Sequence, residues 1–269
     1  MENSISANAK INIGLNIVRR REDGYHDIET IFYPVNIADR IVIRHGTDTN
    51  LACYAGDDGK LMEIAGQNTI DTAFALLKAR YDIPALDVEL YKHIPMGAGM
   101  GGGSADAAFF IRAVNDAFRL GMTTRQMESM AAEIGSDCAF FIENTPKFAT
   151  GRGEVLTPVP SVLDGYVIKV IKPRFNISTK EAYSKVKPMT PKTSLVEDFK
   201  RPVREWRGLI KNDFEASVFP EHPELQRYKD ALYESGALYA SMTGSGSALF
   251  GIFDHEPVLM GEIAELKVD

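Results

Sequence analysis

Apolar and polar residues alternate along the first part of the chain. Seven apolar residues occupy the odd positions from Ile5 to Ile17, and polar or small residues occupy the even positions between them. A period of two is typical of a β-strand with one buried face, so this segment predicts a strand, or two strands joined by a bulge. The polar run at 19–24 predicts a turn. Further strands, expected as an antiparallel group, are predicted at 26–35, 40–44 and 51–55.

Helical spacing begins at residue 68, where Asn68 predicts an N-cap for a helix whose apolar residues from Ile70 to Tyr81 share one face. An apolar helix is predicted over 107–120 and ends before Gly121, which has the character of a C′ glycine. The remaining pattern predicts strands at 86–90 and 166–171, helices near 124–134, 178–183, 203–210 and 223–235, two strands flanking 243–247, and a final helix near 257–266.

A glycine- and proline-bearing tract at 151–160 interrupts these elements. It predicts a boundary between two α+β domains, residues 1–150 and 151–269. The order of strands and helices favours α+β layers over a long βαβ series.

Composition narrows the classes of partner. With 45% hydrophobic residues the chain has enough apolar content for a core, and a net charge of −7 argues against non-specific binding of nucleic acid or an anionic membrane. We find no leader segment and no apolar stretch long enough to span a membrane, and the two cysteines suit neither a disulfide framework nor a thiolate metal site. We therefore expect a cytoplasmic protein with neither nucleic acid nor a membrane as its partner. As a separate expectation, the protein is a monomer or weak homodimer.

A glycine-rich segment carries the strongest chemical signal, with five glycines in the seven positions 97–103. Exposed backbone N–H groups at the start of a helix hold phosphate without a lysine, which suits an acidic chain. The alternative is a tight turn, but one or two glycines would satisfy a turn. Residues 97–102 match G-x-G-x-x-G, yet they follow antiparallel strands and not the first strand of a parallel unit, which disfavours a dinucleotide fold. A P-loop and the protein-kinase motifs are absent from the sequence.

The pattern Pro-x-x-x-Gly-x-Gly-Gly-Gly-Ser-Ala at 95–105 resembles the signature of the GHMP kinase superfamily (galactokinase, homoserine, mevalonate and phosphomevalonate kinases). Four further motifs follow the order of that superfamily: Ala9-Lys-Ile-Asn12, Arg21-Glu-Asp-Gly-Tyr-His26, Gly135-Ser-Asp-Cys138 and Thr243-Gly-Ser-Gly246. Together they resemble the branch that phosphorylates the 2-hydroxyl of a cytidine-diphosphate-linked methylerythritol in the non-mevalonate isoprenoid pathway. The resemblance implies a two-domain fold, with an N-terminal domain like ribosomal protein S5 domain 2, a C-terminal ferredoxin-like sandwich, and an active site in the interdomain cleft.

The resemblance also implies roles for individual residues. Lys10 corresponds to the active-site lysine and Asp137 to the catalytic carboxylate that accepts the hydroxyl proton. Taken by themselves, Lys10 fits a solvated strand face equally well, and Asp137 fits a helix cap beside Ser136.

ATP and Mg²⁺ are the implied cofactors, and the implied ATP-binding residues are Pro95, Met96, Gly97, Ala98, Gly99, Met100, Gly101, Gly102, Gly103, Ser104 and Ala105. Ser104 corresponds to a serine near the phosphates and magnesium, while the metal's protein ligands stay unassigned. The implied substrate-binding residues are Asn12, Tyr25, His26, Tyr183, Thr243 and Gly244, with Tyr25 and Tyr183 as the aromatic side chains that stack on the base.

Two other functions remain open at this stage. Another GHMP kinase acting on a small alcohol such as homoserine or mevalonate would have no base to stack on Tyr25 and Tyr183. A non-catalytic nucleotide-binding protein of the same fold would not require Lys10 and Asp137.

Overall fold

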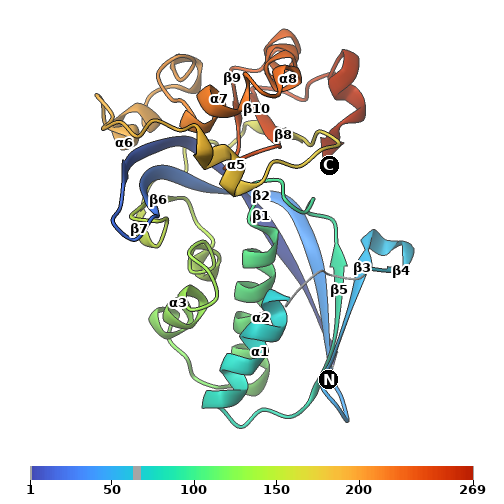
Figure 1. Cartoon of the computed structure of the whole chain (residues 1–269). Helices are drawn as coiled ribbons and strands as arrows, with labels where there is room; N and C mark the ends of the chain where they lie inside the picture. The colour runs from blue at the N-terminus through green and yellow to red at the C-terminus, as the bar shows by residue number, and fades with distance from the viewer. Residues whose placement is uncertain (1, 63–67, 269) are drawn as a thin grey trace. The chain divides into compact units, whose positions relative to one another are not determined.

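The chain folds into two compact units, each built from segments that are separated in sequence (Figure 1). The computed structural model describes residues 2–62 and 68–268. Unit 1 is formed by Met1–Ala9, Asn36–Pro95 and Gly101–Asn144, and unit 2 by Lys10–Val35, Met96–Met100 and Thr145–Asp269. The units are not divided at one position of the chain, and the predicted boundary after residue 150 stays a prediction.

Strand β1 (Glu2–Arg20) confirms the strand predicted from the alternating pattern. Its apolar side chains from Ala7 to Ile17 are buried, as the period of two requires. The central polar positions are buried as well, including Lys10 and Asn12, so the middle of β1 has two covered faces instead of the single one expected. The two runs predicted at 26–35 and 40–44 form one continuous strand, β2 (His26–His45).

The strands of unit 1 include one parallel pair. Strand β5 (Leu86–Lys92) runs antiparallel to the second half of β2, with Arg40 opposite Tyr91. Strand β3 (Asn50–Ala55) runs parallel to β5, a pairing that the sequence analysis did not predict. The connection from β3 to β5 contains a crossover helix, α1 (Thr69–Arg80), which a parallel pair needs. The short elements η1 (Gly56–Asp58) and β4 (Lys60–Leu61) follow β3.

Helices α1 and α2 (Gly102–Phe118) of unit 1 lie side by side (Figure 1). Asn68 caps α1 as predicted, since its side chain accepts a hydrogen bond from the Ile70 N–H. Helix α2 begins within the glycine segment, five residues earlier than predicted, and it ends at Arg119 in a left-handed conformation instead of at Gly121. The remaining helices of this unit are α3 (Thr124–Ala132) and α4 (Phe140–Glu143).

Unit 2 contains two strand systems. Strand β6 (Lys147–Thr150) pairs with the first half of β2, and β7 (Val155–Pro158) pairs with β6. A separate antiparallel sheet has the order β11–β8–β10–β9, formed by β8 (Val167–Ile171), β9 (Tyr239–Met242), β10 (Leu249–Phe253) and β11 (Lys267–Val268). Helix α8 (Pro223–Glu234) packs on β9 and β10 and buries Leu225 and Leu232.

The other helices of unit 2 are short: α5 (Thr179–Ser184), α6 (Leu195–Phe199), α7 (Asp213–Val218), η2 (Val203–Glu205) and η3 (Gly261–Glu265). The helices predicted at 203–210 and 257–266 are single 3₁₀ segments, since Gly208 and Gly261 adopt positive φ angles that interrupt a helix. In the described part of the chain, no helix has the length and apolar character to cross a membrane.

Candidate functional site

Lys10 lies on β1 with its side chain inside unit 2, where only 3% of its surface is exposed. Its Nζ donates hydrogen bonds to Asn12 Oδ1 at 2.5 Å and to the Gly99 carbonyl at 3.3 Å, and it lies 4.7 Å from the centre of the Phe32 ring. Its backbone N–H donates to the Met100 carbonyl. Lys10 is therefore not on a solvated strand face, and it contacts the glycine-rich segment through both backbone and side chain.

Asn12 connects Lys10 to the motif at 243–246. Its backbone N–H donates to Thr243 Oγ1 at 3.0 Å, and its Nδ2 donates to Thr30 Oγ1 at 3.0 Å. The Thr243 hydroxyl donates to the Gly99 carbonyl, which also accepts from Lys10. Three motifs far apart in sequence are thus joined by hydrogen bonds within unit 2.

Gly99 and Gly244 allow two backbones to approach very closely. A Cβ on Gly99 would lie 2.3 Å from the Thr243 carbonyl oxygen, and a Cβ on Gly244 would lie 2.9 Å from the Gly99 carbonyl oxygen. Both residues also have positive φ angles, +75° and +55°. Only glycine fits both positions without a collision.

Two residues that the sequence analysis missed hold the backbone of the 243–246 motif. Asn212, the N-cap of α7, donates from Nδ2 to the Met242 and Gly244 carbonyls at 2.8 and 2.9 Å. Glu215 on the same helix accepts from the Met242 N–H and forms an ion pair with Lys229. An N-cap asparagine has a recognisable sequence signal, but its contacts with a segment 30 residues away have none.

The start of α2 lies in unit 1 and presents backbone donors. The helical ladder begins with the Ala105 N–H bonded to the Gly101 carbonyl, so the N–H groups of Gly102, Gly103 and Ser104 precede it. Free N–H groups and the helix dipole at such an end favour an anion.

Asp137 lies in a turn preceding α4, next to the buried Cys138. Burial raises the pKa of the Cys138 thiol to about 11, although a hydrogen bond with Ser104 acts in the opposite direction. The thiol is protonated at neutral pH, which fits the interpretation of Cys138 as a packed residue and not a nucleophile. Its contacts with Ser104 and Asp137 connect the start of α2 with the 135–138 motif.

The aromatic residues predicted to bind a base all belong to unit 2. His26 and Tyr183 stack with ring centres 4.6 Å apart and planes at 19°, and Phe214 packs edge-on against Tyr183. Burial, with a smaller contribution from Arg20, lowers the pKa of His26, so its imidazole is neutral at pH 7. Tyr25 is 58% exposed, and the Arg152 guanidinium lies 5.1 Å from its ring centre.

The predicted site residues divide between the two units. Unit 2 contains Lys10, Asn12, Tyr25, His26, Met96, Gly97, Ala98, Gly99, Met100, Tyr183, Thr243 and Gly244. Unit 1 contains Pro95, Gly101, Gly102, Gly103, Ser104, Ala105 and Asp137.

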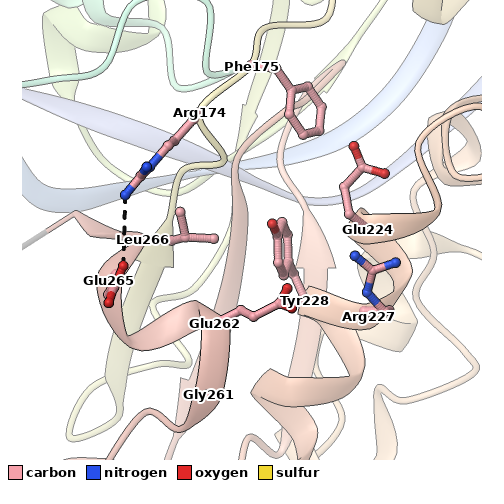
Figure 2. A pocket seen from close by; sticks show the side chains of 9 residues that line it. All are labelled: Arg174, Phe175, Glu224, Arg227, Tyr228, Gly261, Glu262, Glu265 and Leu266. Carbon is pink, nitrogen blue, oxygen red and sulfur yellow. Dashed lines mark ion pairs between the residues drawn. The ribbon is translucent and has the colours of Figure 1, made fainter.

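A pocket of about 670 Å³ in unit 2 involves none of these residues (Figure 2). It lies between α8, η3 and the segment after β8, and an exposed ion pair between Arg174 and Glu265 lies at its edge. Its charged side chains have both signs, which gives it no preference for a phosphate.

The comparisons with known proteins identify the family. The GHMP kinases N terminal domain matches residues 68–144, and the GHMP kinases C terminal domain matches residues 195–258. The chain is 49% identical over 92% of its length to "4-diphosphocytidyl-2-C-methyl-D-erythritol kinase" of Parabacteroides distasonis, of which 90% is covered. The chain belongs to the GHMP kinase family.

Two solved structures support the same conclusion about the fold. A crystal structure of 4-(cytidine 5'-diphospho)-2C-methyl-D-erythritol kinase is 30% identical, with a TM-score of 0.73 over 93% of this chain and 90% of that chain. A homoserine kinase from Cytophaga hutchinsonii aligns with a TM-score of 0.58 at 20% identity over 98% of this chain and 88% of that chain, and shows the fold alone. The predicted two-domain GHMP kinase fold is confirmed, and the chain is an ATP-dependent phosphotransferase.

We predict that Gly99→Ala lowers the stability and the ATP affinity of this GHMP kinase by more than the strain of its left-handed backbone alone would. The new methyl group would collide with the Thr243 carbonyl and separate the two glycine motifs, so the KM for ATP should rise at least roughly 10-fold and the melting temperature should fall. Steady-state kinetics and thermal unfolding measure both effects.

Gly121→Ala is the matched control, because Gly121 has φ +70° but no atom within 4 Å of the position that a methyl group would take. It should cost about 1–2 kcal/mol from the left-handed backbone alone and leave the KM for ATP unchanged. Equal effects of the two substitutions on stability and on KM would contradict the importance of the close approach.

Proposed function

We propose that this kinase transfers the γ-phosphoryl group of ATP to the 2-hydroxyl of 4-diphosphocytidyl-2-C-methyl-D-erythritol, in the non-mevalonate route to isoprenoid precursors. The relative at 49% identity carries that substrate in its name and is covered over nearly its whole length. The observation that supports the proposal most directly is the hydrogen-bonded group of Lys10, Asn12, Gly99 and Thr243, which joins three of the family's motifs.

In the proposed reaction Asp137 accepts the proton of the substrate hydroxyl. The hydroxyl oxygen forms a bond to the γ-phosphorus, the bond from that phosphorus to the β–γ bridging oxygen breaks, and ADP leaves with the electron pair. The Lys10 ammonium neutralises charge that develops on the transferred group. The backbone N–H groups at the start of α2 hold the phosphates.

Magnesium is part of the proposal, and the donors of this chain fit an ion held mainly by ATP and water. Among the described residues no three His, Cys, Asp or Glu side chains are grouped as a metal site. Mg²⁺ commonly keeps several waters and binds through one or two protein oxygens plus substrate phosphates. Ser104 at the start of α2, with the 135–138 motif beside it, offers such oxygens. The bound ion would neutralise phosphate charge.

Other acceptors are less well supported. Homoserine kinase shares only the fold with this chain at 20% identity, and mevalonate has no base for Tyr25, His26 and Tyr183 to contact. A non-catalytic nucleotide-binding protein of the same fold would have no reason to bury Lys10 among hydrogen-bond acceptors.

The acceptor is tested by measuring ADP release with a panel of alcohols. We expect 4-diphosphocytidyl-2-C-methyl-D-erythritol to stimulate release, and homoserine, mevalonate and unsubstituted methylerythritol to leave it at the background rate. Stimulation by one of the small alcohols and not by the cytidine compound would contradict the proposal.

The catalytic roles predict large losses from small changes. Asp137→Asn and Lys10→Ala should each lower kcat by about 100- to 10,000-fold, because the first removes the proton acceptor and the second a positive charge at the site. Asp82→Asn, an exposed carboxylate of unit 1, is the control and should keep the wild-type rate. Circular dichroism would confirm folding, and near-normal turnover in either catalytic variant would contradict its assignment.

The base site predicts a selective effect on one substrate. Tyr25→Ala should raise the KM for the cytidine substrate by roughly 5- to 150-fold, which corresponds to about 1–3 kcal/mol of stacking, while the KM for ATP stays the same. Tyr25→Phe keeps the ring and should behave as wild type. An equal rise of both KM values in Tyr25→Ala would remove this residue from the base site.

A further inference from the structure

Three charged side chains form a buried cluster in unit 1, outside the residues assigned so far. They are Asp39 on β2, Lys92 at the end of β5 and Asp106 on α2, and we call them the acid–lysine triad. Lys92 Nζ donates to Asp106 Oδ2 at 2.7 Å and also to Asp39 Oδ2. The side chains of Asp39 and Asp106 are 0% and 2% exposed, and that of Lys92 is 9% exposed.

Asp39 holds the backbone just before the glycine-rich segment, which we call its entrance. Its Oδ1 accepts hydrogen bonds from the N–H groups of His93 at 2.6 Å and Ile94 at 2.8 Å. These residues directly precede Pro95, where the pattern at 95–105 that contains the glycine-rich segment begins. The position of this entrance is therefore fixed by a carboxylate with no exposed surface.

Lys92 and Asp106 hold the backbone at the C-terminal end of the glycine-rich segment, where α2 begins. Asp106 lies four residues after Gly102, where α2 begins and where the backbone donors are presented. A Cβ on Gly102 would lie 3.0 Å from Ile94 Cγ2 and 3.4 Å from Lys92 Nζ, so the start of the helix packs directly on the residues that form the entrance. The triad thus connects both ends of the segment.

The triad is electrostatically unbalanced, with two carboxylates and one ammonium. Asp106 Oδ1 is buried and has no hydrogen-bond partner among the described atoms. Burial raises the pKa of Asp106 to about 7, while Lys92 opposes the rise and Asp39 adds to it. Burial also raises the pKa of the nearby Cys53 thiol, on which all three charges of the triad act. Buried ion pairs contribute little net stability compared with apolar side chains of similar volume. A role other than stability accounts better for this arrangement.

We propose that the acid–lysine triad is a positioning device for ATP: it fixes the two ends of the glycine-rich segment so that the backbone donors at the start of α2 are preorganised for phosphate. Asp39 has no exposed surface and acts through the backbone of His93 and Ile94 and through its ion pair with Lys92. This inference rests on phosphate binding by the segment and is independent of which alcohol is the acceptor.

The first test is the affinity for ATP, measured by calorimetry without any acceptor. Asp39→Asn should weaken ATP binding about 10-fold or more, because the neutral amide loses the ion pair with Lys92 and presents an N–H₂ group to donors. The KM for the cytidine substrate, measured at saturating ATP, should change less than about 2-fold. Unchanged ATP affinity in a folded Asp39→Asn protein would overturn the proposal.

A second variant separates the positioning role from a role in stability. It replaces Asp39→Asn as the test if that protein does not fold. Lys92→Met with Asp106→Leu replaces the charged link by apolar volume. The buried Asp39 carboxylate then keeps only its two backbone donors, so the melting temperature should fall, and ATP affinity is measured on the folded protein below that temperature. We expect ATP binding to stay weakened about 10-fold in this double variant. Recovery of both stability and ATP affinity would show that the triad only fills the interior, and would overturn the proposal.

Asp106→Asn is the conservative variant, because its amide oxygen still accepts from Lys92. ATP affinity should stay within about 2-fold of wild type, and a loss as large as that of the double variant would overturn the proposal.

The raised pKa of Asp106 means that the folded wild-type protein keeps a proton that the unfolded chain releases, so wild-type stability falls as pH rises from about 4 to 7. In Asp106→Asn this fall in stability should be smaller.

Arg80→Met is the control for the ATP-binding measurements. It removes the ion pair with Glu133 elsewhere in unit 1 and should leave ATP binding unchanged.

If the chain binds ATP but does not phosphorylate the cytidine compound, the proposed acceptor fails while the triad is still tested by these affinities. If the cytidine compound is phosphorylated and the triad variants bind ATP as wild type does, only the triad proposal fails.

Discussion

The burial of the Lys10 ammonium is the constraint on which the arrangement of unit 2 depends. A buried charge without partners is strongly unfavourable, so a lysine that is 3% exposed needs acceptors supplied by other parts of the chain. Asn12 Oδ1 and the Gly99 carbonyl supply two of them. The Thr243 hydroxyl accepts from the Asn12 backbone N–H and donates to the Gly99 carbonyl. The close approach of Gly99 to the backbone at 243–244 follows from this requirement, because any side chain there would separate the acceptor from the donor.

Each unit supports the glycine-rich segment with polar side chains whose own positions are fixed. In unit 2, Asn212 and Glu215 on α7 hold the backbone before and within the 243–246 motif, and that motif in turn contacts Gly99. In unit 1, Asp39 and Lys92 hold the residues on either side of the segment. A loop rich in glycine has high conformational entropy in isolation, and binding that must first order such a loop loses affinity. Fixed neighbours reduce that loss.

The sequence predicted the elements that local rules determine. The alternation in β1 and the Asn68 cap of α1 are local features, and both predictions are confirmed. The parallel pairing of β3 with β5 was not predicted, because register between strands 37 residues apart depends on the crossover between them. The start of α2 at Gly102 was missed because glycine disfavours helix, and here tertiary contacts with Ile94 and Lys92 outweigh propensity. The motifs identified Lys10 and Thr243, whereas Asn212 and the acid–lysine triad act through contacts that no sequence spacing reveals.

A net charge of −7 would by itself oppose the binding of a polyphosphate, but the local groups decide otherwise. Over distances beyond about 10 Å salt screens the acidic surface, whereas N–H groups at a helix start act at hydrogen-bond distance. The same division applies to the triad, whose surplus carboxylate is buried inside unit 1. Because burial raises the pKa of Asp106 to about 7, the triad carries less negative charge at neutral pH than its two carboxylates imply. Selective burial is therefore one way for an acidic protein to hold an anionic ligand. With phosphate bound at the start of α2, as proposed, the protonation of Asp106 is part of the electrostatics of that ligand.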